Sequence, residues 1–140
     1  LMAFDKNMVR LSDSIGNRVV LLFYPAAFTG VCTKEICTFS GSMNRMEAAE
    51  AEVFGISVDG IFANAAFADA NDINFPLLSD TNRQAARAYG VEIPFVMPDY
   101  TASQRSVFVI DEVGKISYAW IAENPGIEPD YEAILEHLES

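Results

Sequence analysis

The sequence predicts an α/β sandwich in which helices flank a central mixed sheet, and three observations carry this prediction. Residues 19–24 and 53–58 are near-continuous apolar runs, the pattern of strands buried on both faces of a largely parallel sheet. Each run is followed by a segment with helical periodicity. Residues 105–121 read as a hairpin, which adds antiparallel strands. We therefore expect residues 1–140 to form a single domain, and Leu1 opens in mid-pattern, which leaves room for residues upstream.

The individual elements follow from local patterns. In order they are a hairpin over 2–4 and 8–11, a loop over 12–17, a strand over 19–24, a helix from 30 to about 49, a strand over 53–58, a helix over 61–70, a short apolar segment over 75–78, a helix from 80 to 89, a loop over 91–100, a hairpin over 105–121, a loop over 124–129 and a helix from 130 to 138. This order of elements is thioredoxin-like.

Specific residues set the ends of these elements. Pro25 cannot donate a ladder hydrogen bond and therefore ends the first buried strand. Asp80 and Asp130 are placed to cap the helices that follow them, and Gly90 ends the first of these two helices. The 91–100 segment holds two prolines and reads as a long surface loop whose Phe95 and Val96 would line an interface or a pocket.

Composition excludes several classes of function. The net charge is −11 and no basic cluster occurs, which argues against nucleic-acid binding. No apolar run reaches the roughly 18–20 residues of a membrane span, and no signal peptide is visible. Two cysteines and one histidine are too few for a four-ligand structural zinc site. One close cysteine pair instead favours redox use in a reducing compartment, so we expect a cytoplasmic protein.

Cys32 is the candidate nucleophile. An apolar stripe at three- to four-residue spacing begins at this position and continues through Ile36, Phe39, Met43 and Met46. Cys32 therefore lies in the first turn of a helix that follows a buried strand, with Thr29 as the capping residue. Free N–H groups and the positive end of the helix dipole favour a thiolate there. The alternative is a small cysteine buried on the core side of its helix.

The pattern Pro25-x-x-x-Thr29-x-x-Cys32 between strand and helix resembles the active-site motif of the peroxiredoxins, and the resemblance covers essentially the whole chain. Arg105, which begins the predicted strand before Asp111, is similar to the family's arginine that reaches the cysteine. Cys37, five residues after Cys32, is similar to the resolving cysteine of the Q-type, or bacterioferritin-comigratory, subgroup.

The resemblance implies a role for each motif residue. Arg105 and the helix amides would lower the Cys32 pKa, since His137 lies in the last helix and reads as plain surface. Thr29, the Cys32 amide and Arg105 would bind the peroxide and stabilise its leaving oxygen, while Pro25 would shield the thiolate from water. Glu35 matches the family's glutamate that holds the arginine, although an exposed acid in the first helical turn is equally compatible.

Cys37 needs a change of structure if it is to pair with Cys32. In an intact helix, residues five apart lie about 140° apart with Cα atoms roughly 8.7 Å apart. A disulfide needs Cα atoms within about 7 Å, so the first helical turns would have to unwind. Otherwise Cys37 is a small helix residue without a redox role.

The resemblance implies a thiol-dependent peroxidase that reduces hydrogen peroxide and organic hydroperoxides without a metal or organic cofactor. Cys32 would become a sulfenic acid, Cys37 would convert it to a disulfide, and a thioredoxin- or glutaredoxin-like protein would reduce that disulfide. Two alternatives stay open: a one-cysteine cycle resolved by an external thiol, and a peroxide sensor or holdase of the same fold. The Cys-x-x-x-x-Cys spacing disfavours a disulfide oxidoreductase. We expect a monomer or homodimer.

Overall fold

The computed structural model describes residues 1–124 and 126–140, and the side chains of Val31 and Cys32 lie outside what it describes. Its elements are β1 (Met2–Ala3), the 3-10 helix η1 (Leu11–Ser14), β2 (Arg18–Phe23), α1 (Gly30–Gly41), α2 (Met43–Ala48), β3 (Ala51–Ser57), α3 (Ile61–Ala70), β4 (Leu77–Ser79), α4 (Gln84–Ala88), β5 (Glu92–Phe95), β6 (Met97–Ser103), β7 (Ser106–Ile110), β8 (Ile116–Ile121) and α5 (Tyr131–Glu139).

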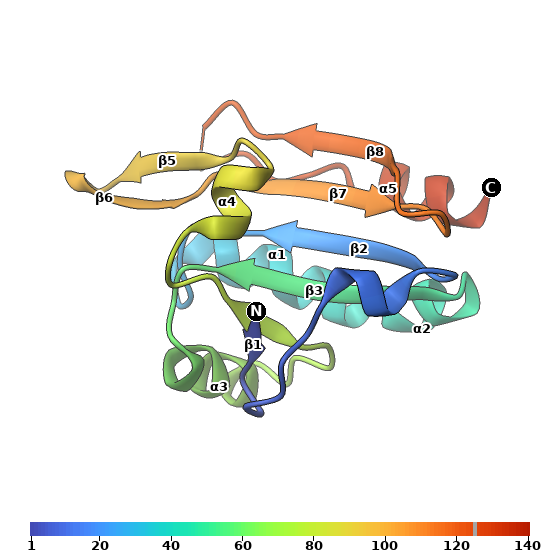
Figure 1. Cartoon of the computed structure of the whole chain (residues 1–140), viewed down its shortest axis with the longest axis horizontal. Coiled ribbons are helices and arrows are strands. Elements are labelled where there is room, and N and C mark those ends of the chain that lie inside the picture. Colours follow the sequence, from blue (N-terminus) through green and yellow to red (C-terminus); the bar gives the residue numbers. More distant parts are fainter. Residues whose placement is uncertain (125) are drawn as a thin grey trace.

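A six-stranded mixed sheet forms the centre of the fold, with strand order β1-β4-β3-β2-β7-β8. β2, β3 and β4 run parallel, whereas β1, β7 and β8 pair antiparallel with their neighbours. Figure 1 shows β2 and β3 running side by side through the middle of the molecule, with their carboxyl ends on the same side. The predicted sandwich around a mixed sheet is confirmed.

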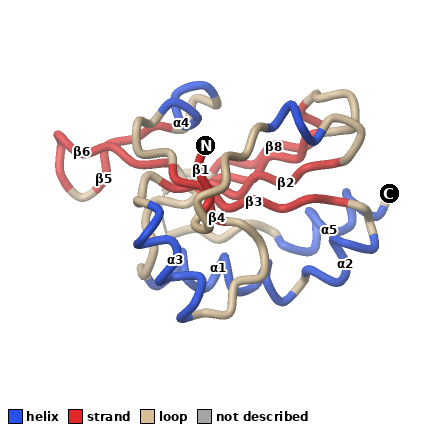
Figure 2. Tube along the Cα trace, turned by 60° about the horizontal axis from the view of Figure 1, so that its bottom comes forward, coloured by secondary structure: helices blue, strands red, loops and turns tan. Residues whose placement is uncertain are grey.

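The two faces of the sheet are covered unequally. α1, α2, α3 and α5 lie below the sheet in Figure 2, while α4 and η1 lie above it. Each face has its own apolar cluster, because side chains alternate along a strand. Val20, Leu22 and Tyr24 point to the helix-rich face, and Val19, Leu21 and Phe23 point to the other. Among the described residues, no helix is long and apolar enough to cross a bilayer.

Gly55 in β3 makes room for the residue that leads into the predicted motif. A Cβ at this position would lie 2.6 Å from Leu77 Cδ2 and 3.3 Å from Tyr24 Cε1. The absence of a side chain at Gly55 therefore lets the fully buried Tyr24 ring lie against β3.

Several predicted boundaries agree with the structure. The helix predicted over 61–70 is α3, and the 105–121 hairpin is β7 and β8, whose turn holds Gly114 at φ 88°. Asp80 accepts from the amides of Ala85 and Ala86, and Asp130 accepts from the amide of Ala133. The predicted cap at Asp130 is confirmed. The helix after Asp80 begins later than predicted, at Gln84 with Arg83 as its N-cap, so Asp80 binds the first-turn amides from four residues before the helix.

The long helix predicted from 30 to about 49 is wrong, because the chain breaks it at Ser42. That residue has φ −101° and ψ 6°, and its amide donates to the Phe39 carbonyl, closing α1 before α2 begins. The N-terminal hairpin is reduced to one bridge, Met2 to Met8, and the 12–17 loop starts with η1. The 124–129 loop includes residue 125, which lies outside the described residues.

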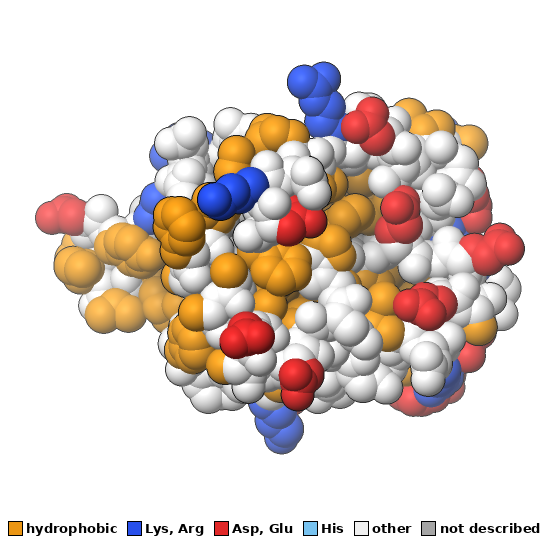
Figure 3. Space-filling model, turned by 90° about the horizontal axis from the view of Figure 1, so that it is seen from below, with side chains coloured by type: hydrophobic (Ala, Val, Ile, Leu, Met, Phe, Trp, Pro, Cys, Tyr) orange, Lys and Arg blue, Asp and Glu red, His pale blue; other side chains and the backbone are white. Residues whose placement is uncertain are grey.

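The largest correction concerns residues 91–100, which form most of an antiparallel arm, β5 and β6, rather than a loop. Prolines are tolerated because each strand of a two-stranded ribbon has a free edge that needs no N–H donor. Val96 turns the chain at φ 70° with its side chain 88% exposed. The arm projects from the body, with apolar side chains at its end (Figure 1, Figure 3). At the base of the arm, Arg83 Nη2 donates a hydrogen bond to the Thr101 carbonyl at 2.9 Å.

Candidate active site

The predicted motif lies where β2 ends, in the loop that leads into α1. Pro25 is buried directly after the strand, and Thr29 is the residue before the helix. Cys32 is the third residue of α1, so its backbone is in the first helical turn as predicted. Its side chain lies outside the described residues. The first turn of α1 contains no acidic residue, so no negative side chain from that turn would repel an anion there.

Strand pairing brings Arg105 to this loop. β7 pairs antiparallel with β2, and Phe23 is directly opposite Ser106. Arg105 therefore lies level with the start of the motif loop although it is far away in sequence. Val107 and Val109 point to the helix-rich face, so the period-2 alternation of a strand directs Arg105 to that face as well.

Arg105 and Glu35 form a buried, hydrogen-bonded pair. Arg105 Nη1 donates to Glu35 Oε1 at 2.9 Å, and the two side chains are 2% and 0% exposed. Glu35 lies one helical turn after Cys32 on α1, so the pair joins the start of this helix to β7. Glu35 Oε2 has no hydrogen-bond partner among the described residues.

Burial changes the protonation of this pair. Desolvation raises the pKa of Glu35 from its ordinary 4.5 to about 8, and Arg105 opposes that rise without cancelling it. The negative charge of Glu128 adds a smaller upward contribution. Below that pH the carboxyl is mainly neutral, so the pair keeps the positive charge of the guanidinium. That charge lies beside the helix that carries Cys32, where it favours an anion.

Thr29 is the N-cap residue of α1 as predicted, but its side chain makes no capping hydrogen bond. The Thr29 backbone carbonyl accepts from the Thr33 amide, but the hydroxyl donates to the Ala26 carbonyl at 2.9 Å. A hydroxyl has only one proton. In this arrangement Thr29 can therefore offer lone pairs, and not a proton, to a bound molecule.

A polar network of Ser57, Asp59 and Asn64 is hydrogen-bonded to the motif loop. The sequence patterns did not indicate it. Asp59 Oδ2 accepts from the Ala27 amide at 2.8 Å and from the Ser57 hydroxyl at 2.8 Å. Tyr24 Oη donates to Asn64 Oδ1 at 3.0 Å, and Asn64 also donates to the Asp59 carbonyl. In the sequence, Ser57 falls within the predicted strand over 53–58 and Asp59 directly follows it, and neither pattern indicates a role at the site. Only the fold brings them under the loop.

This arrangement of motif loop, helix start and buried arginine can be compared with known proteins. The AhpC/TSA family model matches residues 1–119. Peroxiredoxin Bcp of Escherichia coli (strain K12) is 36% identical over 118 residues, which cover 83% of this chain and 76% of that protein. The chain belongs to the peroxiredoxin family. This family is one of thiol-dependent peroxidases.

Solved structures extend the comparison to the fold. Peroxidoxin BcpB from Mycobacterium tuberculosis aligns over 99% of this chain and 90% of its own, at 32% identity and a TM-score of 0.88. The thioredoxin-like peroxiredoxin fold is confirmed. The chloroplastic 2-Cys peroxiredoxin of Hordeum vulgare is 34% identical over 98% of this chain, which spans 68% of that protein. The chain spans about half the length of the spinach and Arabidopsis counterparts.

In this peroxiredoxin, Cys37 lies on the same intact helix as Cys32. Its thiol is half-buried and lies 3.8 Å from Asn71 Oδ1, at the end of α3. His137 lies elsewhere, near the C-terminal end of α5, where its ring contacts the Ser117 hydroxyl at 3.0 Å and packs on Tyr118. Figure 1 shows that end of α5 opposite the carboxyl ends of β2 and β3.

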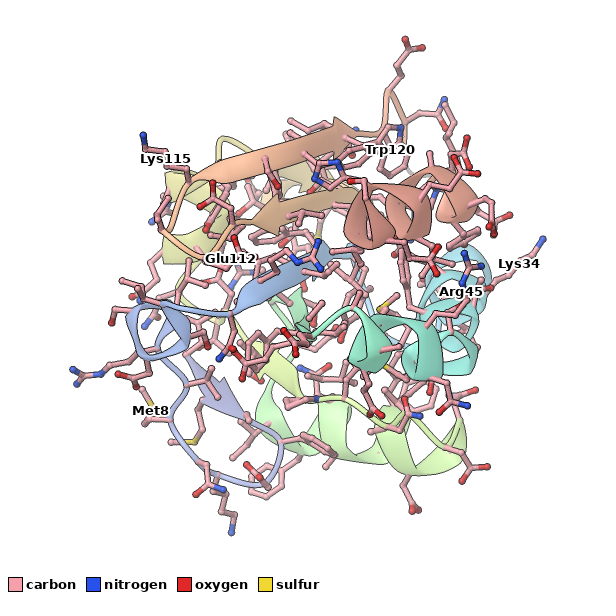
Figure 4. The ribbon with its side chains drawn as sticks, turned by 90° about the vertical axis from the view of Figure 1, so that its right-hand side faces the viewer. Met8, Lys34, Arg45, Glu112, Lys115 and Trp120 are labelled. Carbon is pink, nitrogen blue, oxygen red and sulfur yellow. The ribbon has the colours of Figure 1, made fainter. Side chains whose placement is uncertain are left out.

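A second polar contact, also missed in the sequence, holds α1 to the start of α5. Lys34 Nζ lies 3.1 Å from Glu128 Oε2, and the Tyr131 hydroxyl donates to Glu128 Oε1 at 2.7 Å. The Tyr131 bond, followed by Lys34, lowers the pKa of Glu128. Figure 4 shows Lys34 on the outside of the helix layer, and Arg45 between α2 and α5. Arg45 forms a separate link there, to Glu132 and Glu139.

Glu35→Gln is expected to flatten the pH dependence of stability. Because the folded pKa is raised from 4.5 to about 8, the unfolded state loses this proton first as the pH rises. Stability due to Glu35 is therefore fully present below pH 4.5 and falls as the pH approaches 8. Glutamine keeps the acceptor for Arg105 and does not titrate. Urea denaturation between pH 5 and 9 measures the change, with the exposed Glu47→Gln as the matched control. Parallel curves for all three proteins would contradict the raised pKa.

Proposed function

We propose that residues 1–140 are a single peroxiredoxin domain that reduces hydrogen peroxide and organic hydroperoxides through the Cys32 thiolate. The thiolate sulfur attacks one peroxide oxygen, the O–O bond breaks, and the leaving oxygen takes a proton to become water or an alcohol. Sulfur is oxidised to sulfenic acid and the peroxide is reduced. The single observation that supports this most strongly is the buried Arg105–Glu35 pair beside the first turns of α1.

Two features favour the thiolate at neutral pH. Cys32 is the third residue of α1, within the first turn, where backbone amides have no intrahelical acceptor and the helix dipole has its positive end. Arg105 adds a permanent positive charge that a mainly neutral Glu35 does not cancel below about pH 8. Together they lower the Cys32 pKa without the help of a histidine.

The same groups act on the peroxide. Thr29 Oγ1 has donated its proton to Ala26, so it accepts a hydrogen bond from the peroxide O–H and orients the substrate. Arg105 and the helix amides donate to the oxygen on which negative charge develops as the O–O bond breaks. Pro25, buried at the end of β2, shields the thiolate from water.

Cys37 then resolves the sulfenic acid. Its thiol sulfur bonds to the Cys32 sulfur, the S–O bond breaks, and the hydroxyl leaves as water with the thiol proton. The intact α1 holds the two positions too far apart, so the first helical turns must open. Opening releases the contact of Lys34 with Glu128 and that of Cys37 with Asn71. A thioredoxin- or glutaredoxin-like protein reduces the disulfide.

Cys37→Ser is the test of this step. We expect the first oxidation to stay within about twofold of the parent, because Cys37 takes no part in the attack. Sulfenic acid should persist in the variant and proceed to sulfinic acid at high peroxide. In the parent, amide exchange over residues 30–39 should be faster in the disulfide form than in the reduced form. Equal amide exchange in the oxidised and reduced parent, with no disulfide-linked Cys32–Cys37 peptide after digestion, would contradict this step and favour the one-cysteine cycle.

The function as a whole is tested by intact mass and turnover. One equivalent of peroxide should remove two hydrogens from the reduced chain, whereas a stable sulfenic acid adds one oxygen. Sustained peroxide consumption with a thioredoxin system supports the peroxidase, and stoichiometric oxidation alone supports a sensor or holdase. The cytoplasmic location and the monomeric or homodimeric state stay predictions.

A further inference from the structure

The peptide between Ala26 and Ala27 is held from both sides. Its N–H donates to Asp59 Oδ2 at 2.8 Å, and its carbonyl accepts the Thr29 hydroxyl proton at 2.9 Å. In a trans peptide the N–H and C=O bonds point in opposite directions, so fixing one fixes the other. The carboxylate of Asp59 thus sets the direction of the carbonyl that orients Thr29.

Asp59 is itself held in place. The buried Ser57 donates to the same carboxylate oxygen, and the buried Asn64 donates to the Asp59 carbonyl. Asn64 also joins β4 through Ser79 at 3.2 Å and accepts from Tyr24, the residue before Pro25. Asn64 in α3 and Asp59, which follows β3, therefore support the motif loop on the two sides of Pro25.

The next residue in the loop shows that the backbone is constrained there. Phe28 has φ 65°, a left-handed conformation that is unfavourable for a bulky residue and persists only when its surroundings enforce it. Its ring packs edge-on against Phe67 at 5.2 Å, but the side chain is 58% exposed. Packing holds one side of this residue, and the bond from Ala27 to Asp59 holds the backbone just before it.

We propose that Asp59 is a positioning residue for peroxide reduction, acting through the Ala26–Ala27 peptide on the Thr29 hydroxyl. This inference rests on the proposed function. Without the carboxylate, the peptide can rotate and the Ala26 carbonyl leaves Thr29. The Thr29 proton is then free, and its lone pairs no longer point consistently at the substrate.

The test compares substitutions at Asp59. Asp59→Ala should slow the first oxidation of the protein by hydrogen peroxide about 10- to 100-fold, the scale of a misplaced binding group. Asp59→Asn should recover to within about threefold of the parent, because its amide oxygen can still accept from Ala27. Asp59→Glu should remain slow, since the extra methylene moves the oxygens. The exposed Asp69→Ala on α3 is the matched control and should react like the parent.

A double-mutant cycle with Thr29→Val separates positioning from general destabilisation. If Asp59 acts through the hydroxyl, Asp59→Ala should add little to the loss caused by Thr29→Val. The Cys32 pKa, measured by thiolate absorbance, should be the same in the parent and in Asp59→Asn. Additive losses, or a parent-like rate in Asp59→Ala, would overturn the role of Asp59. If Asp59→Ala does not fold, equal rates in the Asn and Glu variants overturn it. A parent protein that fails to react with peroxide would instead refute the proposed function.

Discussion

Cys32→Ser is expected to reduce peroxide turnover at least about 1,000-fold, the scale seen when a nucleophile is removed. A serine hydroxyl stays protonated in the first turn of α1, and its oxygen cannot take the place of sulfur as the reductant. The fold should be unaffected, since the two side chains have similar size. Stopped-flow oxidation by hydrogen peroxide and far-UV circular dichroism measure the two properties.

Cys37→Ser is the matched control for that experiment. It makes the same atomic change five residues later on the same helix and should retain the first oxidation. A Cys32→Ser protein that reduced peroxide at a rate near the parent's would show that another group is the nucleophile. An equal loss of the first oxidation in both serine variants would also contradict the assignment, because of the two cysteines only Cys32 should take part in that step.

Arg105→Met is expected to slow the first oxidation roughly 100- to 1,000-fold, the scale of losing one donor to a developing oxyanion. It should also raise the Cys32 pKa, because a permanent positive charge is removed from the start of α1. The variant should still fold at neutral pH, since Glu35 has a pKa of about 8 even with Arg105 present and will be protonated without it. Arg105→Lys should recover part of the pKa effect but less of the rate, because an ammonium lacks the planar fork.

Arg45→Met is the control for loss of a cation. Arg45 pairs with Glu132 and Glu139 at the surface between α2 and α5, away from the motif loop. We expect the Cys32 pKa and the oxidation rate of this variant to match the parent's. Thiolate absorbance titrations that coincide for the parent, Arg105→Met and Arg45→Met would refute the electrostatic role of Arg105.

Local patterns predicted the parts of the molecule that depend on near neighbours in sequence. The near-continuous apolar run over 19–24 predicted a strand buried on both faces, and β2 lies inside the sheet between β3 and β7 with an apolar cluster on each face. The stripe that begins at Cys32 placed this residue in the first turn of α1, and Asp130 is the N-cap of α5 as predicted. Hydrophobic periodicity and helix capping depend on residues a few positions apart, so both can be predicted from the sequence alone.

Features that depend on contacts between distant parts of the chain were not predicted from local patterns. The break at Ser42 and the arm of β5 and β6 depend on what the chain packs against, and two prolines made the arm look like a loop. The resemblance to peroxiredoxins indicated that Glu35 holds Arg105. The position of Glu35 in the helix was equally compatible with an exposed acidic side chain. Its complete burial became visible only in the folded chain.

The sequence by itself determined that Cys32 lies at the start of a helix with Pro25 and Thr29 before it, and this pattern predicts the chemistry of this peroxiredoxin. Tertiary structure alone decided how the side chains around the motif are oriented. The Thr29 hydroxyl turns to the Ala26 carbonyl rather than to the helix, Asp59 reaches under the loop, and burial raises the pKa of Glu35. The physical reason is the same in each case. Hydrogen-bond direction and desolvation depend on groups that strand pairing brings together from distant parts of the chain.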